Sequence, residues 1–179
     1  MAAQGSAFNT LSSLSHQFIT TARGLPAQES LAPTRKVVCF SLLGTYMAMA
    51  LEELTEIIEL PSCTRLPRVN GWVLGVANLR GRLLPIVNLA EFLGGELSAP
   101  SRSQRVLVID MMGVFVGLVV DQVFDMRHFG VDTFQSNLDG VPDVLTPYVG
   151  GGFAQDDKNW ALLRPGQLLS DQCFMAVAV

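Results

Sequence analysis

The chain has 179 residues, of which 49% are apolar and only 16% charged, and a formal net charge of −4 at pH 7. This length and composition predict a folded chain with a proper hydrophobic core, in one domain or two closely packed half-domains, and exclude intrinsic disorder. The negative charge argues against nucleic-acid binding, which needs a basic surface. No apolar run is long enough to span a bilayer and no signal peptide is recognisable, so we expect a cytoplasmic protein without direct membrane insertion.

Residues 1–36 differ from the rest and are expected to form an N-terminal extension, because they are rich in Ser, Thr, Ala and Gln. Within them, Phe8, Leu11, Leu14 and Phe18 recur at steps of three and four, which is typical of a short amphipathic helix. A flexible tail is the alternative, and the sequence leaves both open.

From residue 37 onward, short apolar segments are separated by Gly, Pro and Asn, the pattern of short strands joined by turns. The expected strands are, in chain order, 37–42, 46–50, 54–60, the two runs on either side of Arg80-Gly81, 105–110, 114–120, 121–126 and 160–163. A single helical turn is expected at 90–93, and residues 95–103 are the best internal boundary. Because strands and helices do not alternate, we predict a mainly all-β fold of two small barrels, at about 37–95 and about 104–170.

Charged residues are distributed unevenly. One acidic block is followed by one basic block: Glu52, Glu53, Glu56 and Glu59, then Arg65, Arg68, Arg80 and Arg82. Such blocks are typical of solvated faces. The sharper hypothesis is a basic patch that steers an acidic partner.

The sequence offers little catalytic or metal-binding chemistry. Three widely spaced cysteines suit neither a disulfide framework nor a zinc site, and the two histidines have no neighbours at ligand spacing. The segment 150–152 is three glycines and is interpreted as a flexible turn. On a strand, Asp121 and Asp125 would lie about 13 Å apart, too far to act as a coupled acid–base pair. We therefore expect no enzyme activity, cofactor or metal, and keep a small enzyme or ligand-binding barrel as the alternative of another class.

The segment 75–89, with the sequence GVANLRGRLLPIVNL, is the most informative part of the chain. It predicts two short strands joined by a tight turn at Arg80-Gly81. Together with Glu56-Ile57, TRLP at 64–67 and GLVVDQV at 117–123, it resembles the CheW family of chemosensory adaptors at matching spacings. The resemblance covers residues 37–169. The segments 24–29 and 81–86 resemble the PilI-type branch, which serves type IV pili and twitching motility.

The resemblance implies a CheW-like domain over 37–179, with two interlocked five-stranded SH3-like barrels and short helices. It also implies a non-catalytic scaffold that couples methyl-accepting chemoreceptors to a CheA-like histidine kinase. The first half would bind a regulatory domain of the kinase, and the groove between the halves the receptor tip. The implied receptor-binding residues are Leu54, Glu56, Ile57, Asn78 and Arg80, with Arg80 and Glu56 paired. No kinase-binding residue is assigned. A flagellar CheW adaptor is the alternative within the family.

Three departures from the family pattern stand out. Asn88 replaces an Asp that the family usually has, so an anionic role at this position is not expected. Arg164-Pro165-Gly166 interrupts the usual passage from the last strand into the C-terminal helix, which we therefore expect to be short or displaced. The segment 173–179 is unusually apolar and is expected to pack or pair.

Gly75 and Gly81 are expected to serve the turn, and Arg82 is interpreted as a surface charge.

Overall fold

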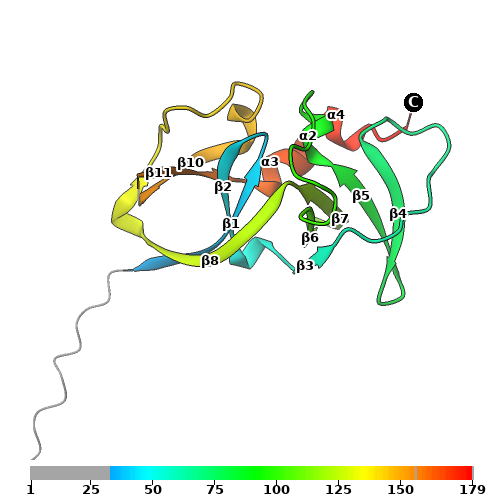
Figure 1. Ribbon diagram of the computed structural model, residues 1–179, viewed down its shortest axis with the longest axis horizontal. Coiled ribbons are helices and arrows are strands. Elements are labelled where there is room, and N and C mark those ends of the chain that lie inside the picture. Colours follow the sequence, from blue (N-terminus) through cyan, green and yellow to red (C-terminus); the bar gives the residue numbers. More distant parts are fainter. Residues whose placement is uncertain (1–32, 156, 179) are drawn as a thin grey trace, which may run out of the picture. The chain divides into compact units, whose positions relative to one another are not determined.

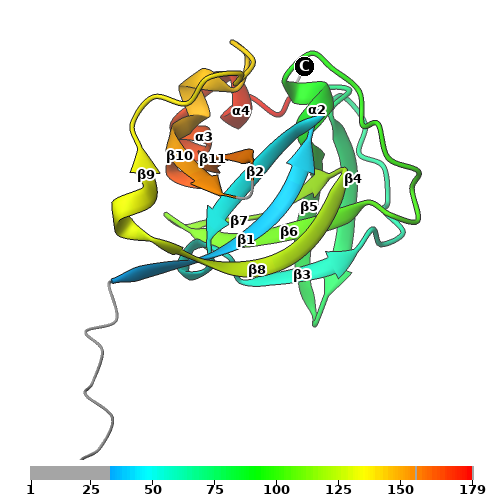
Figure 2. The same ribbon diagram turned by 60° about the vertical axis from the view of Figure 1, so that its left-hand side comes forward.

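The computed structural model describes residues 33–155 and 157–178, so the predicted N-terminal helix or tail lies outside the described residues. The strands form two curled sheets (Figures 1 and 2). Sheet A, in spatial order, contains β8 (Gln122–Gly130), β1 (Thr34–Leu42), β2 (Thr45–Ala50), β11 (Lys158–Leu163), β10 (Val149–Gln155) and β9 (Phe134–Gln135). Sheet B contains β3 (Glu56–Glu59), β6 (Arg105–Met111), β7 (Val114–Val120), β5 (Arg82–Asn88) and β4 (Val73–Leu79).

Short helical segments connect some of the strands or follow the last one. They are the 3₁₀ turns η1 (Leu51–Glu53), η2 (Val131–Thr133) and η3 (Thr146–Tyr148), and the helices α2 (Leu89–Phe92), α3 (Pro165–Ser170) and α4 (Gln172–Met175). The predicted fold class, mainly β with two curled sheets and few short helices, is confirmed. The two-residue strand β9 gives sheet A one strand more than the expected five.

The two sheets are built alike but do not divide the chain in half. Each contains two hairpins joined by one parallel pair, β2 with β11 in sheet A and β5 with β7 in sheet B. Sheet A combines the first two strands of the chain with the last four, and sheet B consists of the five strands between them, β3 to β7. The expected barrels at 37–95 and 104–170 therefore do not correspond to the sheets. The linker at 95–103 is a local feature of the sequence. It cannot reveal that the hairpin β1–β2 pairs with β8 and β11, which lie more than 70 residues further along the chain.

Three apolar clusters explain why the strands read as nearly continuous hydrophobic runs. One cluster fills sheet A and includes Cys39, Phe153 and Trp160, and a second fills sheet B around Leu84 and Val106. The third and largest joins side chains of both sheets. Most strands are thus buried on both faces, and the usual alternation of apolar and polar residues is lost.

Three of the hairpins use the same two-residue turn. Leu43-Gly44, Arg80-Gly81 and Met112-Gly113 each have positive φ at both positions, between 52° and 86°. This is the type I′ geometry, whose twist matches that of the flanking strands. Glycine suits the second position, whereas the first residue adopts a left-handed conformation that L-residues rarely take.

Asp121 joins the two sheets at the passage from β7 to β8. It is 2% exposed, and its carboxylate accepts hydrogen bonds from the backbone N–H groups of Leu43 at 3.1 Å, Ala99 at 3.0 Å and Ser98. These donors belong to the β1–β2 turn and to the linker after α2. Asp125, by contrast, pairs on the surface with Arg127. Asp121 is therefore a structural anchor.

The C-terminal residues pack onto the domain, as expected. Pro165 occupies the first turn of α3, where its missing N–H costs nothing, so the departure from the family pattern starts a helix. Phe174 is 3% exposed and contacts the rings of Trp72 and Phe92. Beyond it, the N–H of Asn70 donates to the Val177 carbonyl at 3.0 Å.

Asn88 caps α2 by accepting from the Glu91 N–H.

The three glycines at 150–152 were expected to form a flexible turn, and this expectation was wrong. They lie in strand β10. A Cβ at Gly150 would collide with the Arg164 guanidinium, at Gly151 with the Gln135 carbonyl, and at Gly152 with the Trp160 carbonyl. Glycine is needed at 151 and 152 because backbone carbonyls approach closely, whereas at 150 the flexible Arg164 side chain would have to shift.

Candidate functional site

The segment singled out in the sequence forms the β4–β5 hairpin, with Arg80 at its tip. Leu79 pairs with Arg82, and Arg80-Gly81 closes the turn. The Oδ1 atom of Asn78 accepts a hydrogen bond from the Gly81 N–H at 2.8 Å. The Asn-x-x-Gly spacing thus stabilises the turn through a hydrogen bond within it. The side-chain oxygen of Asn78 is used in this bond. Asn78 positions Arg80 at the tip of the hairpin.

Arg80 and Glu56 form the pair that the family resemblance implies. Nη2 of Arg80 lies 2.8 Å from Oε2 of Glu56 in β3. Their side chains are 80% and 21% exposed, respectively. Because the Arg80 side chain is so exposed, removing one partner does not leave a deeply buried, uncompensated charge. A pair with one partner so exposed contributes about 0–1 kcal/mol.

Leu54 and Ile57 flank Glu56 but are half-buried. Both pack against the cluster shared by the two sheets. The N–H of Thr55 between them donates to the Val108 carbonyl at 2.8 Å, which fixes this short segment against β6. Only part of each side chain remains exposed for a partner, and on strand β3 the side chain of Ile57 lies on the opposite face from Glu56.

Two features of the hairpin were missed in the sequence. Leu83 is 70% exposed, although it lies in an otherwise apolar strand. Arg82 is more than a surface charge: it pairs with Asp110 at 2.7 Å and lies 3.8 Å above the centre of the Phe115 ring. Strand alternation gave a signal for Leu83, because it lies on the opposite face from buried Leu84. No sequence signal linked Arg82 to Asp110.

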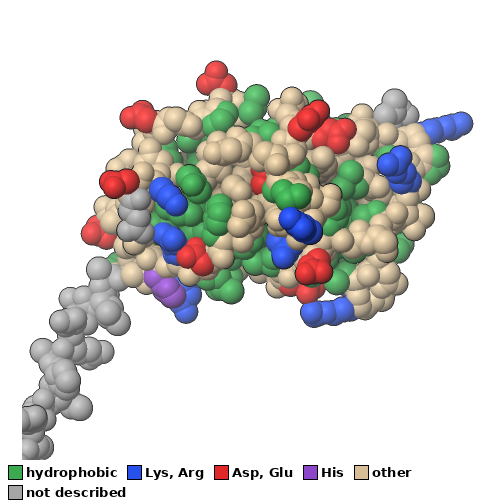
Figure 3. All heavy atoms as spheres, viewed as in Figure 1, with side chains coloured by type: hydrophobic (Ala, Val, Ile, Leu, Met, Phe, Trp, Pro, Cys, Tyr) green, Lys and Arg blue, Asp and Glu red, His purple; other side chains and the backbone are tan. Residues whose placement is uncertain are grey.

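The predicted basic patch is partly neutralised. Arg80 and Arg82 each have an acidic partner, whereas Arg65 and Arg68 lie on the loop before β4. On the face shown in Figure 3, acidic and basic side chains are interspersed with apolar ones. The hairpin therefore presents directed hydrogen-bond donors more than a general positive potential.

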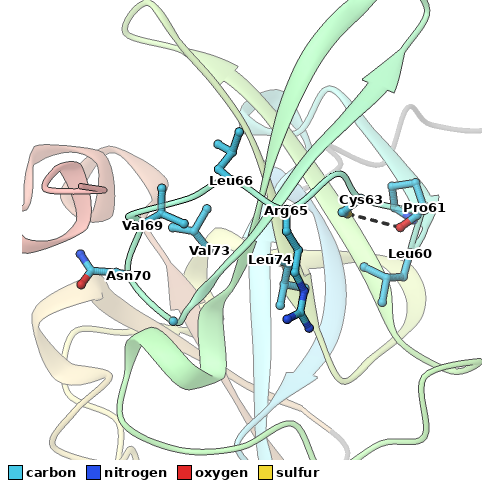
Figure 4. A pocket seen from close by; sticks show the side chains of 10 residues that line it. Leu60, Pro61, Cys63, Arg65, Leu66, Val69, Asn70, Val73 and Leu74 are labelled. Carbon is cyan, nitrogen blue, oxygen red and sulfur yellow. Dashed lines mark hydrogen bonds between the residues drawn. The ribbon is translucent and has the colours of Figure 1, made fainter. Parts of the chain in front are cut away.

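A hollow of about 420 Å³ lies beside β4, under the loop that precedes it (Figure 4). Its walls combine apolar side chains, including Leu60, Leu66 and Leu74, with polar groups, and Arg65 is the charged member. The Cys63 thiol donates to the Pro61 carbonyl at 3.4 Å, and burial raises its pKa. Gly75 lets this loop approach, because a Cβ there would collide with the Thr64 carbonyl. Its role is loop packing, not the turn that the sequence suggested.

Among residues 33–155 and 157–178, no group of three or more His, Cys, Asp or Glu side chains is placed to hold a metal ion. In the same part of the chain, no helix is both long and apolar enough to cross a membrane.

Comparison with known proteins places this chain in a family. Residues 36–173 match the family model described as CheW-like domain. The chain is 42% identical over 158 residues to Protein PilI of Pseudomonas aeruginosa, covering 88% of each chain. It is 33% identical over 108 residues to the chemotaxis protein CheW of Thermotoga maritima, covering 60% of this chain and 70% of that one.

The fold has a counterpart among solved structures. The scaffolding protein TtCheW from Thermoanaerobacter tengcongensis superposes with a TM-score of 0.66 at 24% sequence identity, covering 74% of this chain and 90% of that chain. Because the family match spans most of the described residues and the likeness to PilI nearly the whole chain, this protein belongs to the CheW-like family.

Proposed function

We propose that this chain is a non-catalytic scaffold that couples chemoreceptors to a CheA-like histidine kinase, in a chemosensory system controlling type IV pili and twitching motility. The observation that carries the proposal is the exposed Arg80, held at the hairpin tip by Asn78 and Glu56, in a chain of the CheW-like family. The protein would act in the cytoplasm, beside membrane-bound receptor arrays.

The receptor-facing site would consist of the Arg80–Glu56 pair and its apolar neighbours Leu54, Ile57 and Leu83. Glu56 contacts one terminal nitrogen of Arg80, which leaves other guanidinium N–H groups for an acceptor on the receptor tip. Leu83 adds an exposed apolar contact at the same hairpin. The kinase would bind elsewhere on the domain, through apolar surface.

The pilus branch is favoured over a flagellar adaptor by the extent of similarity. The likeness to PilI covers 88% of this chain, against 60% for the Thermotoga maritima CheW. A test in cells follows directly. Deletion of the gene should abolish twitching while leaving swimming intact, and loss of swimming alone would favour the flagellar adaptor.

Binding measurements test the scaffold itself. The full chain is mixed with its cognate kinase and with a receptor signalling-tip fragment, and each affinity is measured by surface plasmon resonance. We expect both to bind. Arg80→Glu should weaken receptor binding about tenfold or more, because a carboxylate would then face both Glu56 and the acceptor on the receptor tip. Kinase affinity should stay within about twofold.

The matched control is Arg102→Glu, which reverses an exposed arginine on the linker before β6. It should leave both affinities unchanged. If the wild type binds neither partner, the scaffold function is wrong. If Arg80→Glu loses its circular dichroism spectrum together with binding, Arg80 is structural and the site assignment fails.

A further inference from the structure

A second hollow lies at one end of sheet A, away from the β4–β5 hairpin. Its volume is about 240 Å³, and its lining residues are Arg35, Val131, Phe134, Phe153 and Arg164. Arg35 is the second residue of β1, and the start of this strand lies beside η2 and β9 (Figures 1 and 2). Cavities that enclose whole small molecules are usually about 300–1,000 Å³. This hollow is therefore of a size suited to a side chain.

The walls between the two arginines are apolar. Phe153 is 1% exposed, and its ring meets that of Phe134 edge-on, with 5.5 Å between centroids. Val131 is 53% exposed at the rim. An apolar group placed here would cover the exposed side chain of Val131 and the partly exposed ring of Phe134.

The two guanidinium groups are available to a ligand. Arg35 and Arg164 are both exposed, and neither side chain has a hydrogen bond or ion pair with any residue of 33–155 or 157–178. The Arg164 side chain lies directly against Gly150, where a Cβ would collide with it and force it to shift. A glycine thus keeps space for this arginine on strand β10.

Acidic residues line only one of the two hollows that the arginines share. A smaller hollow of about 130 Å³ is lined by Arg35 and Arg164 together with Glu52 and Glu53. Burial raises the pKa of Glu53, and the two nearby arginines oppose this shift. The carboxylate of Glu53 attracts both guanidinium groups without hydrogen bonding to them. On the opposite, apolar side the lining includes no acidic residue.

We propose that the hollow between Arg35 and Arg164 binds an acidic segment of a partner protein. An apolar side chain of that segment would lie between Val131, Phe134 and Phe153, and an adjacent carboxylate would accept hydrogen bonds from the two guanidinium groups. A planar guanidinium matches a carboxylate with two parallel hydrogen bonds. A peptide supplies both groups at the spacing of neighbouring residues. The site lies on sheet A and does not depend on the receptor-facing hairpin of sheet B.

The probe for a test is the peptide acetyl-Phe-Glu-amide, titrated into the ¹⁵N-labelled full chain and followed by two-dimensional NMR. The expected result is a set of saturable shifts at Val131, Phe134, Phe153 and their neighbours. Arg164→Gln and Arg35→Gln should each weaken binding about tenfold, because each removes a charge-assisted contact. Gly150→Ala should weaken it similarly, since it displaces Arg164 without changing any charge. Arg102→Gln is the matched control and should bind like the wild type.

Two further peptides decide what is recognised. Acetyl-Phe-Gln-amide lacks the charge, and acetyl-Ala-Glu-amide lacks the aromatic ring; both should bind at least about tenfold more weakly than the probe. Equal binding of either peptide would overturn the proposal, as would an absence of shifts with the probe at millimolar concentration. Should Gly150→Ala fail to fold, as judged by its NMR spectrum, the two arginine variants still decide the question.

Discussion

Arg80 and Glu56 connect the two outer strands of sheet B. In that sheet β3 and β4 lie at opposite edges, yet Nη2 of Arg80, in the turn after β4, is 2.8 Å from Oε2 of Glu56 in β3. The pair therefore meets where the curled sheet brings its edges together. Arg80 also has a φ of 52°, a left-handed conformation that favours Asn or Gly over Arg.

The first prediction separates stability from binding at this turn. Arg80→Asn gives the Asn-Gly sequence that type I′ turns prefer. Relief of the left-handed strain is worth about 1 kcal/mol and offsets loss of the exposed ion pair, worth about 0–1 kcal/mol. Urea unfolding should show a free energy equal to or above that of the wild type, while receptor affinity falls. A loss of more than about 1 kcal/mol in stability would show that the pair is structural.

The second prediction concerns the buried carboxylate. Asp121→Ala leaves the N–H groups of Leu43, Ser98 and Ala99 without their acceptor, so the free energy of unfolding should fall by about 3 kcal/mol or more. Asp125→Ala is the matched control four residues later. It removes a surface pair with Arg127 and should cost about 1 kcal/mol at most. Equal losses in the two variants would contradict the anchoring role of Asp121.

Two glycines of the hairpin should respond differently to alanine. At Gly81 a Cβ meets nothing within 4 Å, so Gly81→Ala adds only the strain of its positive φ, about 1–2 kcal/mol. Gly75→Ala adds both a strained φ and a collision with the Thr64 carbonyl, and should cost about 3 kcal/mol or more. Thermal unfolding of the two variants measures the difference. A smaller loss for Gly75→Ala would mean that the preceding loop moves away easily.

Tyr148 makes stability depend on alkaline pH. Burial, then the hydrogen bond that its hydroxyl donates to Asp171, raises the Tyr148 pKa from 10.0 to about 12. A raised pKa means that the native state holds its proton more tightly than the unfolded state. This contribution is therefore complete below about pH 10 and is lost as the pH rises towards about 12.

The measurement is the free energy of unfolding in urea between about pH 8 and pH 12. The wild type should lose stability across this range more steeply than Tyr148→Phe, which has no phenol to ionise at this position. Parallel curves for the two proteins would show that Tyr148 ionises equally well in the folded and unfolded chains. The same hydrogen bond lowers the pKa of Asp171, so on the acid side its stabilisation is lost as the pH falls below the ordinary value of 3.8.

The hairpin site was largely predictable from the sequence, because its determinants are local. Turn residues at fixed spacing specify Arg80-Gly81, and the family motif drew attention to Glu56. What could not be predicted was the burial of each partner. The exposure of Arg80 depends on how far the hairpin projects beyond β3, and this is a property of the packed sheet. For the same reason, Leu54 and Ile57 proved to be half-buried.

The sequence by itself determined most of the short strands, the tight turn at Arg80-Gly81 and membership of the CheW-like family, because strand runs, an X-Gly turn and motif spacing involve residues close along the chain. Only the tertiary structure decided which hairpins share a sheet, what Arg82 and Asp121 contact, and that Arg35 and Arg164 face one hollow. Asp121 and Leu43, for example, are 78 residues apart. Such contacts form when the apolar faces of strands are buried together. Because these faces have similar composition, local sequence patterns do not reveal which face packs against which.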